Sequence, residues 1–422
     1  RLPNVILSLG LGTLTFVWGR KLFGGYRMTT WLMILVSTLL FSNLQKFASG
    51  DLSLAWFQLL AFLAFLRYLK QPGLNWLLFA LLFTGLAVWA NPFQSFVWSI
   101  GLFGALILLH KDRKKILFAP VWLLPALACA VLLALGKLEY SLPEFYLGLG
   151  GDWDFGRQYL LQLIGVLPWI GFVVPGLWEL QKRLRKGEEL AVLQFAALLA
   201  GLLNPGLFLA MALALLAMRQ VADYAHPNYP NRSLARTFAI AHLLLVFVLG
   251  VVSMIWGFSV MGGIGFRSFM AVMLPYWIAS FLTVSGMVGL DARYYIGAPA
   301  MAGLLFTATV WIQLGPILEN RRNLPEKLSE YIQKDPQFTP PLHIQLEDQR
   351  QSAVYAIYAE KLLGSVIIYE ETPSWSGTYL LDSLNREQLK QAEVPILLEQ
   401  RFENWEGLAQ KQPYWLISCG AE

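Results

Sequence analysis

The side chains that could do chemistry in this chain are few, because 56% of its residues are hydrophobic and only 14% are charged. Asp51 opens the apolar segment GDLSLAWFQLLAFLAF, which places its carboxylate at the mouth of a helix long enough to cross a bilayer. A carboxylate in that position can act as a general base that takes a proton from an acceptor hydroxyl. Asp also caps helices, since it accepts hydrogen bonds from the free N–H groups of a first turn. Both interpretations of Asp51 stay open.

A second group of ionisable side chains lies in the segment LEYSLPEFYLGLGGDWDFGRQYLLQ, residues 138–162. It combines aromatic residues with the carboxylates of Glu144, Asp152 and Asp154 and with the guanidinium of Arg157. A carboxylate here could orient an acceptor or support a general base, and an arginine could hold a phosphate through its fork of donors. The alternative is a solvated amphipathic loop that takes no part in chemistry.

Arg267 follows the sequence GGIGF and stands near the start of an apolar segment. A cation near a helix N-terminus is electrostatically disfavoured, so an anion such as a phosphate or a lipid headgroup would compensate it. The alternative is that its side chain extends to lipid headgroups and binds nothing specific.

These residues are positioned by a series of apolar segments, each near the ~17–25 residues that cross a bilayer. We count about twelve, at 3–18, 28–45, 52–68, 74–91, 94–110, 117–136, 159–180, 189–203, 207–219, 237–257, 268–288 and 295–313. The stretch 189–219 is either one helix broken at Asn204-Pro205-Gly206 or two helices. Sixteen Trp and sixteen Tyr are consistent with aromatic belts at the two membrane interfaces.

Lysine and arginine fall on alternate connections between these segments, which predicts the orientation of the chain. The positive connections contain Arg20, Lys21 and Arg27, then Arg67 and Lys70, then KDRKK at 111–115, KRLRK at 182–186, Arg219, Arg232 and Arg236, and Arg293. We expect this set in the cytoplasm, with residue 1 and the C-terminus on the other side. The net charge of +5 then reflects topology, and no nucleic-acid partner is expected.

The composition becomes polar from about residue 316, which predicts a membrane domain at 1–315 and a small soluble α/β domain at 316–422. Its expected strands are 342–346, 365–370, 394–399 and 414–418, and its expected helices are 324–333, 383–391 and 402–409. It carries no nucleophile motif or Gly-rich phosphate loop. Two cysteines and four scattered histidines support no metal site. The domain is either a lid or acceptor-docking element or purely structural.

Several blocks of the chain, taken in order, resemble the bacterial GT-C glycosyltransferases. They are RLPNVILSLGLGTLTFVWGRKLFGG (1–25), GDLSLAWFQLLAFLAFLRYL (50–69), LLFTGLAVWANPFQSFVW (81–98) and YLLQLIGVLPWIGFVVPGLW (159–178). Within that superfamily the chain is most similar to the aminoarabinose transferases that modify lipid A and to related mannosyltransferase-like enzymes. That family has one spanning helix more than our count, so we expect its first helix, with an outer loop that holds an Asp and a phosphate-binding Lys, to be missing here.

The resemblance implies roles for several residues and also shows departures. Asp51 matches the family's second outer Asp. Asn91, in Ala90-Asn91-Pro92, and Asn204, in Leu203-Asn204-Pro205-Gly206, stand where the family often has cations, and the family's Glu-His pair is replaced by Gly-Asp-Trp-Asp. Arg157 and Arg267 would then bind the phosphate, unless the donor differs or the chain is inactive.

The function implied is transfer of a sugar from a polyprenyl-phosphate carrier to a lipid A, glycan or protein acceptor at the periplasmic face of the bacterial inner membrane. We expect no cofactor, with a divalent cation as the one exception left open. The competing interpretations are a transporter or flippase for lipid-linked glycans, an inactive scaffold, and a glycan polymerase or ligase. A transporter is expected to show paired broken helices, and the sequence has one candidate break, at 204–206.

Overall fold

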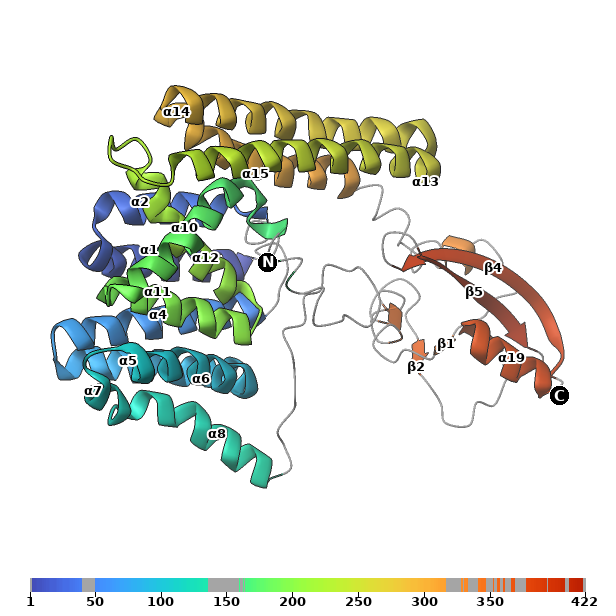
Figure 1. Ribbon diagram of the computed structural model, residues 1–422. Helices are drawn as coiled ribbons and strands as arrows, with labels where there is room; N and C mark the ends of the chain where they lie inside the picture. Colours follow the sequence, from blue (N-terminus) through green and yellow to red (C-terminus); the bar gives the residue numbers. More distant parts are fainter. Residues whose placement is uncertain are drawn as a thin grey trace. The chain divides into compact units, whose positions relative to one another are not determined.

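The computed structural model describes most of the first three quarters of the chain and parts of the remainder (Figure 1). The described residues are 2–39, 50–135, 159, 162, 164–315, 328, 330–332, 341–346, 352, 355–356, 360, 366–368, 377–392, 394–406 and 410–419. The chain divides into two compact units, and the division falls between Trp311 and Ile312.

The first unit is built from helices. They are α1 (Leu2–Phe23), α2 (Gly25–Ser37), α4 (Gly50–Lys70), α5 (Leu74–Ala90), α6 (Pro92–Leu109), α7 (Arg113–Leu117), α8 (Leu123–Ala134), α10 (Ile170–Arg185), α11 (Glu189–Leu203), α12 (Leu207–Asp223), α13 (Arg232–Gly289), α14 (Ala292–Tyr295) and α15 (Gly297–Thr309). Short 3₁₀ turns at Pro120–Trp122 and Leu167–Trp169 precede α8 and α10, and a π-helical turn, Val310–Leu314, follows α15. Pro120 is the first residue of one 3₁₀ turn and Pro168 is the second residue of the other, and these prolines limit how far the α-helices extend towards the N-terminus.

Five helical segments in the described part are long and apolar enough to cross a bilayer. They are Leu52–Lys70, Pro92–Leu109, Arg232–Ser259, Gly262–Gly289 and Ala292–Leu314, and three shorter apolar helices, Leu74–Ala90, Pro120–Ala134 and Glu189–Leu203, accompany them. The chain is therefore a helical protein with several apolar spans. The count of twelve spans stays a prediction. The interruption at Asn204 does separate two helices, α11 and α12.

The helix α13 is a hairpin of two antiparallel helices. Gly262 breaks it with φ 64° and ψ −150°, a conformation that only glycine adopts easily. Across the hairpin, Trp277 Nε1 donates to the Val246 carbonyl at 3.1 Å, and His242 Nε2 lies 3.1 Å from the Tyr276 hydroxyl. Arg267 lies in the second turn after this break, close to the helix start that the sequence predicted.

The two ends of the helical unit differ in charge. The connections rich in Lys and Arg gather at one end, which we call the positive face, where ion pairs join them. Arg27 Nη2 lies 3.4 Å from Asp223, and Lys111 Nζ lies 3.2 Å from Glu189. The alternation of charge along the sequence therefore corresponds to an actual grouping of the helix ends.

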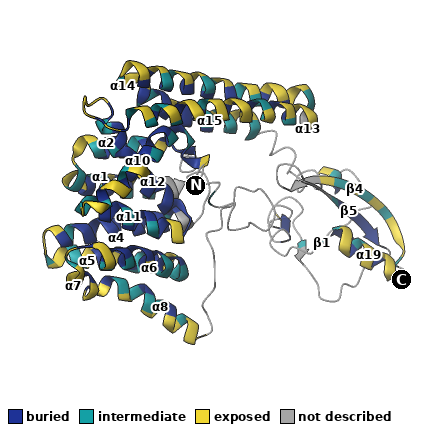
Figure 2. Cartoon of the chain, in the orientation of Figure 1, coloured by how far each residue is buried: buried dark blue, intermediate teal, exposed yellow. Residues whose placement is uncertain are grey.

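Burial within the first unit distinguishes a core from a lipid-facing rim (Figure 2). Almost every residue of α12 is buried, whereas both halves of α13 carry many exposed apolar side chains such as Leu244 and Phe281. A layer of apolar side chains that stays exposed suits contact with acyl chains, since lipid is as apolar as the side chains themselves.

The second unit contains a five-stranded mixed sheet in the order β2-β1-β3-β5-β4. Its elements are β1 (Leu342–Gln345), β2 (Val366–Ile368), β3 (Gly377–Leu381), α19 (Ser383–Gln391), β4 (Ile396–Glu406) and β5 (Gln410–Cys419). Strand β1 runs parallel to β2 and β3, and β5 runs antiparallel to β3 and β4.

Most elements predicted for this unit are present, with two corrections. The expected helix at 402–409 is wrong as far as Glu406, because these residues continue β4; residues 407–409 lie outside the described part. Phe402 pairs with Tyr414 and Trp405 with Lys411, so pairing with β5 overrides the helical propensity of the Glu-rich sequence. Strand β3 was missed, and the predicted helix 324–333 lies mostly outside the described residues.

Candidate active site

The end of the unit opposite the positive face, which we call the far end, is formed by the α5–α6 and α11–α12 connections and the first turn of α4. Gly101 packs against the backbone of Ala200, where an added Cβ would come within 2.7 Å of the Ala200 Cα. The rings of Trp98 and Phe208 meet edge to face at 5.8 Å. The N-terminal half of α6 therefore lies directly beside the α11–α12 turn.

The buried face of α6 at the far end is polar, which is unusual for a span. Gln94, Ser95, Trp98 and Ser99 are at most 3% exposed. Their spacing of one, three and four residues places them on one continuous side of the helix. We call these four residues the α6 polar stripe.

Three groups of this stripe lack a hydrogen-bond partner among the described residues. They are the hydroxyls of Ser95 and Ser99 and the indole N–H of Trp98; both amide atoms of Gln162 share this property. A buried polar group without a partner costs about 1–3 kcal/mol. The stripe thus offers several donors that a phosphate or a sugar could use.

Near the far end, three segments meet in one buried contact: the end of α2, the 3₁₀ turn before α10, and α15. Trp169 Nε1 donates to Ser37 Oγ at 2.9 Å, at the end of α2. Gly303 of α15 approaches the same place so closely that an added Cβ would overlap the Ser37 carbonyl oxygen. Small residues allow such close approach of helices in membranes.

The structure gives two of the predicted site residues a definite local role. Asn91 caps α6, since its Oδ1 accepts from the Gln94 backbone N–H at 3.0 Å. Asn204 ends α11, is 6% exposed, and donates its backbone N–H to the Ala200 carbonyl at 3.2 Å. Both asparagines therefore lie at the far end, beside the polar stripe.

The other predicted residues are placed less fully. Asp51 lies in the first turn of α4, and its side chain is outside the described part. Arg267 is exposed on the second half of α13. The remaining candidates, namely Glu144, Asp152, Asp154 and Arg157, lie outside the described residues. Within the described residues no group of three or more His, Cys, Asp or Glu could hold a metal ion.

The polar stripe was missed at the level of sequence. In the block WANPFQSFVW the predicted site residue is Asn91 alone, although Gln94, Ser95 and Ser99 interrupt an apolar span. Polar residues on one side of a spanning helix indicate a face turned away from lipid. That signal was available without the structure.

The positive face holds a network of charges that fixes helix ends. Arg183 Nε donates to Glu188 Oε2 at 2.6 Å, and its Nη1 donates to Gln194 Oε1 at 3.0 Å. The bond from Arg183 holds the pKa of the Glu188 carboxyl below its ordinary value, although burial acts in the opposite direction. Arg219 adds contacts to Glu179 at 3.4 Å and to Glu188 at 3.8 Å.

Comparison with solved structures gives two matches, and both are structures of the same protein. The chain aligns with ArnT from Cupriavidus metallidurans in the apo state over 99% of its own length and 83% of that chain, with a TM-score of 0.58 and 13% identity. The chain has the ArnT fold. The structure of ArnT bound to undecaprenyl phosphate also matches, with a TM-score of 0.56, 13% identity, and 98% and 83% of the two chains covered.

The ArnT fold confirms the predicted resemblance to GT-C glycosyltransferases at the level of architecture. No family model matches the chain, and comparison with curated protein sequences gives no match either. At 13% identity the comparison with ArnT identifies the fold only.

Proposed function

We propose that this chain is a membrane glycosyltransferase that moves a sugar from a polyprenyl-phosphate carrier to an acceptor at the periplasmic face of the bacterial inner membrane. The observation that carries the proposal is the likeness to ArnT along nearly the whole chain, which includes a structure bound to undecaprenyl phosphate. The buried donors of the α6 polar stripe, at the far end, support it independently.

The reaction requires a cation or donors that stabilise the leaving phosphate, and a base for the acceptor hydroxyl. Preorganised donors at a developing charge are worth about 3–4 kcal/mol each in known enzymes. Arg267 and Arg157 are the proposed phosphate-binding cations. The hydroxyls of Ser95 and Ser99 and the indole N–H of Trp98 are proposed to donate to the sugar or to the phosphate.

Asp51 is the proposed general base, with Asp152 or Asp154 in support and Glu144 as a further substrate-binding carboxylate. Asp51 lies in the first turn of α4, so its backbone is at the start of that helix. A base that reaches the acceptor proton contributes roughly 10²–10⁴-fold to the rate. The oxygen of the acceptor would form the new glycosidic bond while the polyprenyl phosphate leaves with the bonding electron pair.

The sugar and the acceptor are proposed only as classes: a sugar carried on polyprenyl phosphate, and a lipid A, glycan or protein hydroxyl. We propose that the C-terminal domain predicted at residues 316–422 lies on the periplasmic side and guides the acceptor. It would then be the part of the chain that determines which acceptor is used.

The test is a transfer assay with purified protein in detergent and polyprenyl-phosphate-linked radiolabelled sugars. We expect release of the free carrier together with labelling of the acceptor. Asp51→Asn should lower transfer by at least a hundredfold and leave folding unchanged. Asp112→Asn, at the N-terminus of α7 on the positive face, is the matched control and should transfer normally. Equal transfer by the Asp51→Asn variant would exclude Asp51 as the base, and no carrier release with any donor would refute the proposed function.

A further inference from the structure

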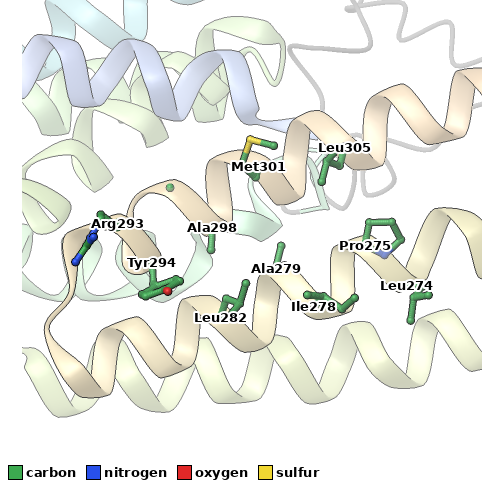
Figure 3. A pocket seen from close by; sticks show the side chains of 11 residues that line it. Leu274, Pro275, Ile278, Ala279, Leu282, Arg293, Tyr294, Ala298, Met301 and Leu305 are labelled. Atoms are coloured by element: carbon green, nitrogen blue, oxygen red, sulfur yellow. The ribbon is translucent and has the colours of Figure 1, made fainter.

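A groove of about 520 Å³ lies between the second half of α13 and α15 (Figure 3). Its apolar lining comes from Leu274, Pro275, Ile278, Ala279 and Leu282 on one side and from Ala298, Met301 and Leu305 on the other. Both walls belong to segments apolar enough to span a bilayer, Gly262–Gly289 and Ala292–Leu314.

The groove opens towards lipid. Ile278 is 53% exposed and Met301 is 49% exposed, although both lie within apolar spans. Exposed apolar side chains at that depth contact acyl chains in a membrane. An acyl chain could therefore enter the groove sideways from the bilayer.

One end of the groove is cationic and polar. Figure 3 shows Arg293 and Tyr294 together at that end, with the apolar side chains running away from them along both helices. The Arg293 side chain is 90% exposed. Its described partner is Asp291, whose Oδ1 accepts from the backbone N–H at 3.0 Å and from Nε at 3.4 Å. The two terminal nitrogens of the guanidinium point to no described partner and can bind an anion.

This end belongs to the positive face. Arg236 donates from Nη2 to the carbonyls of Met287 and Val288, at 3.0 and 3.1 Å, where α13 ends just before Arg293. The guanidinium of Arg236 is thus used by the helix end, whereas that of Arg293 is presented outward.

The length of the groove fits one leaflet. From Tyr294 in α14 to Leu305 in α15 there are eleven residue steps, which include the turn at Ile296; at the helical rise of ~1.5 Å per residue they span at most roughly 16 Å. The hydrocarbon core of a bilayer is ~30 Å thick, so half of it is about 15 Å. A groove of this length beside a cation matches one phospholipid of a single leaflet.

We propose that this groove binds an anionic phospholipid of the leaflet at the positive face. Its phosphate lies against the terminal nitrogens of Arg293 and the hydroxyl of Tyr294, while Asp291 keeps the guanidinium in place through Nε. One acyl chain follows the groove past Ala298 and Met301. This site is separate from the far end. The proposal that it binds a lipid does not depend on whether the chain transfers sugars.

The test is native mass spectrometry of the purified protein in detergent, titrated with phosphatidylglycerol or phosphatidylcholine. The wild-type protein should bind phosphatidylglycerol more tightly than phosphatidylcholine. A basic side chain near an anionic lipid is worth ~1 kcal/mol, so Arg293→Gln should weaken phosphatidylglycerol binding about fivefold. Arg185→Gln, an exposed arginine at the end of α10, should bind as the wild type does.

A second pair of variants tests the groove itself. Met301→Trp fills it and should weaken both lipids, whereas Leu304→Trp, on the same helix but outside the groove lining, should have no effect. Equal affinities of the wild type and Arg293→Gln for phosphatidylglycerol would overturn the proposal. Complete displacement of phosphatidylglycerol by equimolar undecaprenyl phosphate would also overturn it, because the carrier would then be the occupant.

Discussion

Removal of the unpaired hydroxyls in the α6 polar stripe should make the ligand-free protein more stable and should reduce the further stabilisation that a bound ligand gives. Ser95 is 0% exposed and Ser99 is 3% exposed, and neither hydroxyl has a described partner. Ser95→Ala and Ser99→Ala each remove one oxygen and leave the backbone and the packing of neighbouring rings unchanged. The perturbation is therefore close to the loss of a single buried polar atom.

The magnitude follows from the cost of burying such an atom. An unsatisfied buried group costs about 1–3 kcal/mol, and the lost packing of one oxygen reduces the gain, so we expect about 1 kcal/mol per substitution. For a unit of this size that is an increase of roughly 2–4 °C in Tm. The double variant should gain roughly twice as much if the two sites act independently.

The assay is thermal unfolding in detergent, with and without undecaprenyl phosphate. Without ligand both variants should unfold at higher temperature than the wild type. With undecaprenyl phosphate the wild type should be stabilised, and the variants should gain less, because a ligand stabilises the folded state according to its affinity.

A matched control separates this effect from a general one of Ser→Ala. Ser253 is satisfied within its own helix, since its Oγ donates to the Leu249 carbonyl at 2.7 Å, so Ser253→Ala should not raise Tm. If Ser95→Ala and Ser99→Ala also left Tm unchanged and the ligand shift intact, the stripe would be an ordinary packed interface and the reasoning would be refuted.

Three further substitutions or measurements test other parts of the structure. Arg183→Gln should cost about 2 kcal/mol of unfolding free energy, less than the ~3–5 kcal/mol of a fully buried pair, because Glu188 stays 42% exposed. The folded pKa of Glu188 is depressed, so this contribution is present above the ordinary pKa of 4.5 and is lost as pH falls through the folded pKa. The Tm values of wild type and variant should therefore converge in acid. Gly303→Ala should cost about 1–3 kcal/mol, measured as a lower Tm, because the new methyl group overlaps the Ser37 carbonyl; an unchanged Tm would mean that α2 and α15 are not in this contact. Burial raises the pKa of the Cys419 thiol to about 11, so iodoacetamide at pH 8 should modify it slowly in the folded protein and quickly in denaturant, and equal rates would contradict its place in the sheet.

The helical part of the fold was largely predictable because apolar length and charge alternation are direct consequences of the bilayer. The starts of α6 and α12 were predicted to within two residues, since Pro92 and Gly206 mark them. The start of α10 was not predicted, because the 3₁₀ turn at Leu167–Trp169 is as apolar as the helix that follows.

The second unit was harder because short strands depend on their partners. The helix α19 was predicted with its observed bounds, since Asp382 is a clear N-cap whose Oδ1 accepts from the Asn385 N–H. The segment from Phe402 to Glu406 was mistaken for a helix, because its strand conformation is imposed by β5 rather than by its own propensity.

The functional roles of the predicted site residues stay a prediction, and the structure places only some of these residues. Asn91 and Asn204 do lie at the end of the helical unit opposite the positive face, as the charge alternation required. The polar stripe beside them could not be inferred from charged residues, because its donors are neutral. Its signal in the sequence is that Gln94, Ser95 and Ser99 interrupt an apolar span.

The central claim is that the far end, beside Asn91 and Asn204, receives a polyprenyl phosphate. The most direct test is photo-crosslinking of the purified protein with a short prenyl phosphate that carries a diazirine next to the phosphate, followed by mass spectrometry of the peptides. We predict labelling of α6 between Asn91 and Ser99 that unlabelled undecaprenyl phosphate suppresses. Labelling confined to α15 or the positive face, or labelling that undecaprenyl phosphate leaves unchanged, would contradict the claim.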